Sequence, residues 1–320
     1  REQVGAGFAG SCGFLSVPGP FSVRRDNVPG TQLIISDRNM RKKIAALLLI
    51  LSCLGSAEAQ KHRRHPDPER FPDTAEVYSR LESVPPFGIY KDNYFVTGSS
   101  FSGGKLTKNN SDAKFQISIR HRLIKGVLPF HTYLFLTYTQ KSFWDIYKKS
   151  KPFAESNYNP TLGLGTPITR RDKLVGLGML QFEHESNGRG GDSSRSWNRI
   201  SLTGIFEFNR RFSGELKLWI PMGLSDNPDY VRYGGYGQAA VNYKSLDERV
   251  RLSLLVVKRG GWNLNANLRL EAGYRLSRRS NQYLFLQYYN GYAESMIEYR
   301  QFHSYWRIGF AIKPRGWTIF

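Results

Sequence analysis

From about residue 91 onward, apolar and polar residues alternate in short runs that turn residues separate. In the run 115–120, Phe115, Ile117 and Ile119 would share one face of a strand, because successive strand side chains point to opposite faces. Alternating segments of about ten residues are typical of membrane β-barrels, which have an even number of antiparallel strands. The pattern predicts an all-β, transmembrane antiparallel β-barrel of about twelve strands within residues 91–320. The expected strands are 91–99, 113–123, 132–143, 158–165, 173–186, 196–209, 212–222, 236–245, 249–258, 263–275, 282–290 and 303–313.

Hydropathy and aromatic residues fit this prediction. The mean hydropathy is −0.46 and the chain has no run of about 20 apolar residues, which argues against a transmembrane helix but not against a barrel. Tyr and Trp cluster near the ends of the expected strands, where aromatic girdles of barrels lie. Charged residues on the other face, namely Arg120, Arg199, Glu183 and Glu207, could pair across the lumen. A soluble, secreted all-β protein is the less favoured alternative.

The amino-terminal part carries an export signal. Met40 opens a basic stretch, an apolar core follows at 44–54, and the small residues at 57–59 fit a cleavage site. We therefore predict a signal peptide at 40–59, the alternative being a buried apolar element. Residues 1–39 are then an over-extended gene start or disordered. Both cysteines, Cys12 and Cys53, precede the expected mature end near Gln60, so the exported protein needs no disulfide.

Residues 60–90 are polar and Pro-rich, and they show no strand periodicity. We expect an extended amino-terminal segment, part of which packs into or across the barrel. His62 and His65 fit a solvated basic tail better than a metal pair, because no further ligand lies near them. The formal charge of +20 does not indicate a nucleic-acid partner in an exported protein. The arginine doublets in the expected turns fit either solvated turns or attraction to anionic lipid head groups.

The run 182–200 departs from the barrel pattern. His184 and Ser186 have the same parity as Phe182, on the apolar face that would meet lipid, and Asn198 has the parity of Ile200. A polar group that faces hydrocarbon without a partner costs about a few kcal/mol. The glycine-rich reversal between the two strands would bring Asn198 beside His184.

These residue types are those of an activated nucleophile. A serine hydroxyl gives its proton to a histidine, which a third group orients. The amide of Asn198 can accept a hydrogen bond from the imidazole N–H of His184. Polar decoration near the membrane interface is the alternative explanation. The motif G-x-S-x-G is absent, which argues against an α/β-hydrolase.

The segment "HESNGR…SRSWNR" at 184–199 resembles the outer-membrane phospholipase A family, calcium-dependent lipid hydrolases of Gram-negative bacteria. The resemblance extends over most of residues 85–313 and implies a twelve-stranded barrel. It implies a nucleophile at Ser186, a general base at His184, an orienting amide at Asn198 and an oxyanion-binding backbone N–H at Gly188. The further matching segments are "YTQKSFWDIY" (138–147), "PFAESNYNP" (152–160), "DNPDYVRYGGYGQ" (226–238) and "GYAES" (291–295).

The same resemblance implies a calcium ion and a dimer. The metal contacts fall on the carbonyls of Arg189 and Ser194 and on Ser150 of the partner subunit. The family has an acidic ligand where this chain has Gly191, and Asp192 is the candidate substitute. Gln140 matches a polar, membrane-facing residue at the family's dimer interface, and its parity suits that position.

The function implied is calcium-dependent hydrolysis of the acyl esters of phospholipids, of A1 and A2 type, and of lysophospholipids. The resemblance implies that a homodimer in the bacterial outer membrane, reached through the cleaved signal peptide, carries out the reaction. A non-catalytic outer-membrane barrel, either a small channel or an adhesion protein, is the alternative.

Overall fold

The computed structural model describes residues 74–100, 107–171 and 173–314 of the 320-residue chain. The expected signal peptide and the residues before it lie outside this part. No helix in the described part is long and apolar enough to cross a membrane.

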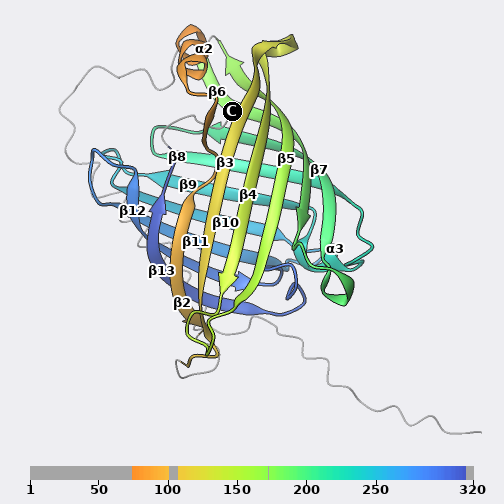
Figure 1. The fold of residues 1–320 in the computed structure, drawn as a ribbon. Coiled ribbons are helices and arrows are strands. Elements are labelled where there is room, and N and C mark those ends of the chain that lie inside the picture. Colours follow the sequence, from red (N-terminus) through yellow and green to blue (C-terminus); the bar gives the residue numbers. More distant parts are fainter. Residues whose placement is uncertain (1–73, 101–106, 172, 315–320) are drawn as a thin grey trace, which may run out of the picture. The chain divides into compact units, whose positions relative to one another are not determined.

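Twelve antiparallel strands, β2 to β13, form a closed barrel in chain order, because β13 pairs with β2 as well as with β12 (Figure 1). The barrel confirms the predicted fold, and the strands fall on the predicted runs, with β3 and β5 longer than expected. The barrel strands are β2 (Asn93–Ser100), β3 (Ser111–Leu128), β4 (Thr132–Trp144), β5 (Phe153–Arg170), β6 (Lys173–Ser186), β7 (Ser196–Glu207), β8 (Phe212–Met222), β9 (Gly237–Lys244), β10 (Val250–Lys258), β11 (Ala266–Arg275), β12 (Gln282–Gly291) and β13 (His303–Ile312). Short helical elements are η1 (Pro129–His131), η2 (Gly191–Ser193) and α3 (Tyr230–Gly234).

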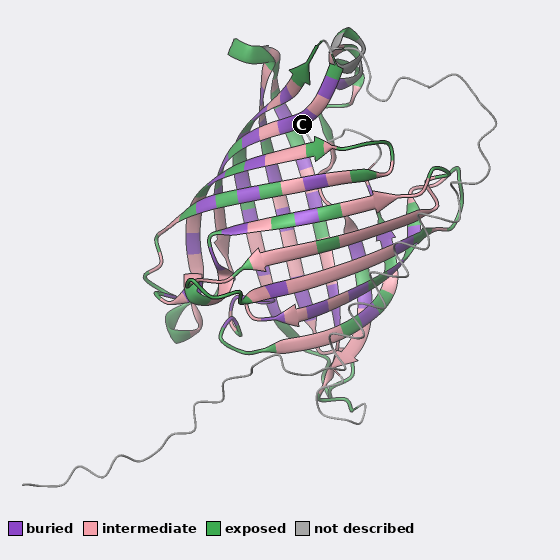
Figure 2. Ribbon diagram, turned by 180° about the vertical axis from the view of Figure 1, so that it is seen from behind, coloured by how far each residue is buried: buried purple, intermediate pink, exposed green. Residues whose placement is uncertain are grey.

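Burial alternates along the strands, as Figure 2 shows. In β8, Leu216, Leu218 and Ile220 expose 51%, 53% and 69% of their surface, whereas Lys217 and Trp219 on the other face are buried. In an ordinary soluble protein such side chains would fill a core, so their exposure around the outside marks a surface that meets lipid. The outward-facing positions predicted from the alternation are confirmed.

Polar and charged side chains line the lumen. Arg199 and Lys217 both contact the carboxylate of Glu183, each at 2.6 Å, so one predicted lumenal pair forms. The other two predicted partners do not pair with any described charged residue. Arg120 lies beside the amino-terminal segment and donates to a backbone carbonyl there at 3.5 Å, and Glu207, near the end of β7, lines a lumenal cavity of about 600 Å³.

Part of the amino-terminal segment is helical, which corrects the expectation of an extended chain. Helix α2 (Thr74–Ser83) ends before Pro85 and Pro86, since proline disfavours a helical conformation in the residue before it. Leu81 is buried in an apolar cluster with residues of β4 and β6, and the Arg122 guanidinium donates to the carbonyls of Leu81 and Val84. The short strand β1 (Phe87–Ile89) then pairs with β3. The helix was not predicted because the segment is mostly polar and the helix buries one leucine.

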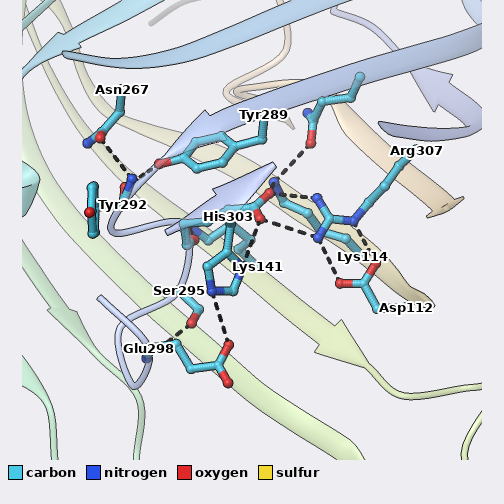
Figure 3. Close-up of polar contacts among 12 residues, drawn as sticks. Asp112, Lys114, Lys141, Asn267, Tyr289, Tyr292, Ser295, Glu298, His303 and Arg307 are labelled. Atoms are coloured by element: carbon cyan, nitrogen blue, oxygen red, sulfur yellow. Dashed lines mark hydrogen bonds and ion pairs between the residues drawn. The ribbon is translucent and has the colours of Figure 1, made fainter. Parts of the chain in front are cut away.

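The loop between β12 and β13, residues 292–302, is tied to the barrel wall by buried charges (Figure 3). The Glu294 carboxylate accepts from Arg307 at 2.7 Å and from Lys114 at 3.0 Å, and Arg307 also donates twice to Asp112. Burial alone would raise the pKa of Glu294, but the charges of Arg307 and Lys114 outweigh it and lower the pKa. Glu294 therefore remains ionised.

We expect Glu294→Gln to lower the free energy of unfolding by about 3 kcal/mol or more, because Arg307 and Lys114 would keep buried charges without their partner. Urea unfolding of the barrel in detergent micelles measures this change. The matched control is Glu298→Gln in the same loop, where the carboxylate is about half exposed and the cost should stay below about 1 kcal/mol. Equal effects of the two substitutions would contradict a loop held to the wall by buried charge.

Candidate active site

The hairpin of β6 and β7 brings His184 and Asn198 directly opposite each other. Their side chains meet on the outer face, where His184 Nδ1 lies 2.9 Å from Asn198 Oδ1. An amide oxygen can only accept a hydrogen bond, so Nδ1 carries the proton in the neutral ring and Nε2 keeps a free lone pair. The contact thus orients the imidazole with a basic nitrogen available.

Ser186 lies two residues beyond His184, on the same face of β6 and opposite Ser196. The side chain is partly buried. In the described part of the chain, the Ser186 hydroxyl has no hydrogen-bond partner, so the structure brings His184 and Asn198 together but leaves Ser186 beside them. Its neighbours along the same face, Leu180 and Phe182, each expose about half of their surface, so the residues sit at the end of a lipid-facing row.

The pairing between β5 and β6 is interrupted beside the imidazole. Tyr158 pairs with Ser186 and Thr161 with Glu183, which places Pro160 opposite His184. Proline has no N–H to donate to the ladder. The side-chain amide of Asn159 instead donates to the His184 carbonyl at 2.7 Å. Sequence reasoning missed this role, although the matching segment at 152–160 contains both Asn159 and Pro160.

Asn187 organises the loop that connects β6 to β7. Its side chain is 4% exposed, and its oxygen accepts from the backbone N–H groups of Arg189 at 3.2 Å and Arg195 at 3.0 Å. Its amide nitrogen donates to the Ser193 carbonyl at 2.8 Å. A single buried amide therefore holds both arms of the loop, a role that sequence reasoning also missed.

Gly188 occupies a position that only glycine suits. Its φ of +65° lies in the left-handed region, and a Cβ there would come within 3.0 Å of the Tyr158 ring. The loop can therefore bring the Gly188 backbone close to Tyr158 of β5. Whether its N–H binds an oxyanion remains a prediction.

Arg189, Ser194 and Asp192, three of the residues expected to contact a metal, lie on this loop, and Asp226 reaches it from the loop between β8 and β9. Ser194 Oγ donates to an oxygen of Asp226 at 2.6 Å, and Ser196 Oγ contacts the same oxygen at 3.1 Å. These two hydrogen bonds lower the pKa of Asp226, so the carboxylate is charged at neutral pH. Asp226 is the first residue of the segment 226–238, which resembles the phospholipase A family in sequence but to which the sequence assigned no role. Gly191 has a φ of +59°, a conformation that an acidic residue would adopt with strain.

Asp192 is exposed on the short turn η2. Its carboxylate forms neither an ion pair nor a hydrogen bond in the part of the chain that the structure describes. No cluster of three or more His, Cys, Asp or Glu side chains that could hold a metal occurs among the described residues. Any ion here would depend largely on backbone carbonyls and the Asp226 carboxylate, which are oxygen donors of the kind that calcium prefers.

The other two predicted residues lie away from the hairpin loop. Ser150 is exposed in the loop 145–152, with a φ of +70°, and no hydrogen bond joins it to residues 187–195. Gln140 is partly buried on β4, where it accepts from Tyr138 at 3.2 Å and donates to Ser142 at 3.1 Å.

Rigid contacts on the lumenal side support the hairpin from behind. Arg199 contacts Glu183 and Glu185, one on either side of His184 in β6, and its guanidinium stacks on Trp197 at 4.5 Å. These contacts join β6 to β7 at the level of the imidazole. The backbone that carries His184 and Asn198 is therefore fixed from the inside of the barrel.

Comparison with known proteins matches residues 88–313 to the family model of phospholipase A1. Phospholipase A1 of Salmonella typhimurium is 36% identical over 224 residues, which are 66% of this chain and 73% of that protein. The calcium-bound outer membrane phospholipase dimer of Salmonella typhi is 28% identical, with a TM-score of 0.64, over 77% of this chain and 99% of that one. The outer membrane phospholipase A of Escherichia coli with an active-site asparagine changed to alanine is also 28% identical, with a TM-score of 0.63, over 74% and 97%.

The barrel, the polar residues on its outer face and the match over more than half of the sequence agree with one another. This chain belongs to the phospholipase A1 family.

Proposed function

We propose that this protein hydrolyses the acyl esters of membrane phospholipids with Ser186 as nucleophile, His184 as general base and Asn198 as the orienting group. The contact of 2.9 Å between His184 and Asn198 on the lipid-facing wall is the observation that carries the proposal. The related Escherichia coli structure, in which an active-site asparagine has been replaced, supports a functional asparagine.

The reaction follows from the tautomer. The proton on Nδ1 stays on the ring in its hydrogen bond to Asn198. His184 Nε2 therefore accepts the proton of Ser186 as Oγ attacks the ester carbonyl carbon. Ser186 must turn toward Nε2 when an ester binds, and such hydrogen bonds commonly tighten only in the substrate complex. Collapse of the tetrahedral intermediate transfers the proton from Nε2 to the leaving alcohol and leaves an acyl group on Ser186. Water, deprotonated by the same nitrogen, then releases the fatty acid.

The position of the site determines how the substrate arrives. Exposed apolar side chains of β6 and β7, including Phe182 and Ile200, line the wall next to His184. An acyl chain can lie against this row while its ester reaches the polar end. Substrate therefore enters from the bilayer rather than through the lumen. An open wall does not enclose either ester position, so the proposal includes A1 and A2 cleavage and lysophospholipids.

We extend the proposal to calcium. The carbonyls of Arg189 and Ser194, with the Asp226 carboxylate, would hold the ion, and the calcium-bound Salmonella typhi relative supports this assignment. When bound, the ion would supply positive charge that stabilises a developing oxyanion. We assign the acidic ligand to Asp226 instead of Asp192, the candidate from the sequence, because the Asp226 carboxylate accepts a hydrogen bond from Ser194.

The proposal also includes a homodimer in the outer membrane. The Salmonella typhi relative is a dimer, and Ser150 is exposed where a second subunit could reach it. Gln140 offers an amide on the lipid-facing side of β4, where few polar groups occur. If dimerisation completes the calcium site, the isolated subunit would lack a complete site and would be nearly inactive.

We expect Ser186→Ala to reduce fatty-acid release from phospholipid in detergent by about 10⁴-fold or more, because no other group would form the acyl intermediate. Ser253→Ala, the same change in the lumenal part of β10, should leave the rate unchanged. Full activity of Ser186→Ala would overturn the mechanism. If wild type released no fatty acid but conducted ions in planar bilayers, the protein would instead be a channel.

We expect Asn198→Ala to lower kcat by about 10- to 100-fold with little change in KM, because the imidazole would lose its orienting partner but the acyl-binding wall would remain. Steady-state kinetics on a soluble ester substrate measure both constants. A rise in KM with kcat unchanged would show that Asn198 binds substrate rather than orienting His184.

We expect Asp226→Asn to raise the free calcium needed for half-maximal activity about tenfold, since the proposed site would lose its one carboxylate. Initial rates in calcium–chelator buffers give this value. The matched control is Asp247→Asn, another exposed and hydrogen-bonded carboxylate in the turn between β9 and β10. A wild-type rate that chelator does not change would remove calcium from the account.

A further inference from the structure

Three loops at the same end of the barrel as the hairpin loop 187–195 form a small basic pocket. They connect β8 to β9, β10 to β11 and β12 to β13, and antiparallel order places all of them at one end. The pocket has a volume of about 290 Å³ and receives Arg232, Arg259 and Arg300, one from each loop. None of these residues belongs to the proposed ester-cleaving site.

A buried amide holds two of the loops of the pocket together. Asn267 is 2% exposed and donates to the Tyr233 carbonyl at 2.8 Å. Its oxygen accepts from the Tyr292 N–H at 2.9 Å (Figure 3). The rings of Tyr233 and Tyr292 lie 5.2 Å apart. Gly260 packs so closely on the backbone of Arg232 that a Cβ would come within 3.1 Å of its Cα. Contacts within the chain thus fix the three loops to one another.

The charge of the pocket is only partly compensated. Arg300 is paired with Asp229, whose oxygens accept at 2.9 and 3.0 Å. Arg232 and Arg259 form no ion pair with any described residue, and Nε of Arg259 is buried with no hydrogen-bond partner in that part of the chain. Three guanidinium groups and one carboxylate leave a net charge of +2 (3 − 1). The Arg259 guanidinium is held over the Tyr292 ring, 4.8 Å from its centre.

This chemistry suits a phosphate. Guanidinium groups present planar pairs of donors that match phosphate oxygens, and a phosphomonoester near neutral pH carries about −1.5 to −2 charges. A single carboxylate would satisfy one guanidinium and leave the others without a partner. The pocket therefore favours a doubly charged tetrahedral anion.

Apolar side chains on the same loop indicate that the phosphate belongs to a lipid. Trp262 and Leu264 are fully exposed, at 107% and 99%, on the loop that carries Arg259. Water is an unfavourable environment for both, and tryptophan is enriched at membrane interfaces. A lipid would place its head group in the pocket and its acyl region against these two side chains.

We propose that Arg232, Arg259 and Arg300 bind the phosphomonoester head group of an anionic membrane lipid, with Trp262 and Leu264 anchored in its apolar part. The site goes beyond the proposed hydrolysis and is tested without it. Its occupant would hold this end of the barrel at the surface of the bilayer, beside the loops that carry Asp226 and Ser194.

The test is isothermal titration calorimetry of the full chain in non-ionic detergent. The ligand is an ether-linked phosphatidic acid, which has no ester to cleave, so failure of the lipid site and failure of the hydrolase proposal are distinguishable. Ether-linked phosphatidylcholine and inorganic phosphate are the comparison ligands. We expect the phosphatidic acid to bind at least about tenfold more tightly than either of them.

Two variants and a matched control complete the test. R232Q and R259Q should each weaken phosphatidic acid binding about tenfold, whereas R278Q, an exposed arginine between β11 and β12, should change nothing. W262S should weaken binding of the lipid but not of phosphate. Equal affinity for the two lipids, or unchanged binding by R232Q and R259Q, would overturn the site. Phosphate binding as tight as lipid binding, with W262S unchanged, would overturn the lipid as its occupant.

Discussion

Closure of the backbone ladder between β13 and β2 is the constraint on which the rest of the structure depends. Hydrocarbon offers no partner for a free N–H or C=O group, so only a ring of strands without open edges can stand in a bilayer. The ring imposes a period of two on every strand. One set of side chains must meet lipid and the other must fill the lumen, and both compositions follow from this division.

The proposed active site is an exception to this division, because it places polar residues among the lipid-facing positions. His184 and Asn198 occupy lipid-facing positions where an unpaired polar group costs free energy, and His184 Nδ1 donates a hydrogen bond to Asn198 Oδ1. The strand beside them carries Pro160, which weakens the ladder, and Asn159 supplies the missing donor from the lumenal side. Charges inside the barrel, Glu183 and Arg199, hold the hairpin in register. The polar residues of the proposed site can therefore face lipid because lumenal ion pairs hold the strands that carry them.

The sequence predicted the strands, their facing and the pairing of His184 with Asn198, because all three follow from the two-residue period and one short reversal. It did not predict what depends on contacts between distant segments. Asp226, in the loop between β8 and β9, contacts Ser194 in the loop between β6 and β7. Glu294 contacts Lys114, which lies 180 positions earlier in the chain. Helix α2 was missed because it buries a single leucine. Gly191, the residue that departs from the family, coincides with a left-handed backbone, and the carboxylate beside the loop comes from Asp226 instead.

The most direct test of the central claim is to identify the residue that reacts as nucleophile. The oxygen of an activated serine attacks the phosphorus of a long-chain fluorophosphonate and expels fluoride. The phosphonate stays covalently attached to the serine, so peptide mass spectrometry locates the residue that reacted. The account predicts a single adduct on Ser186 that is lost in His184→Ala. An adduct on another serine, or one on Ser186 that forms equally fast without His184, would contradict it.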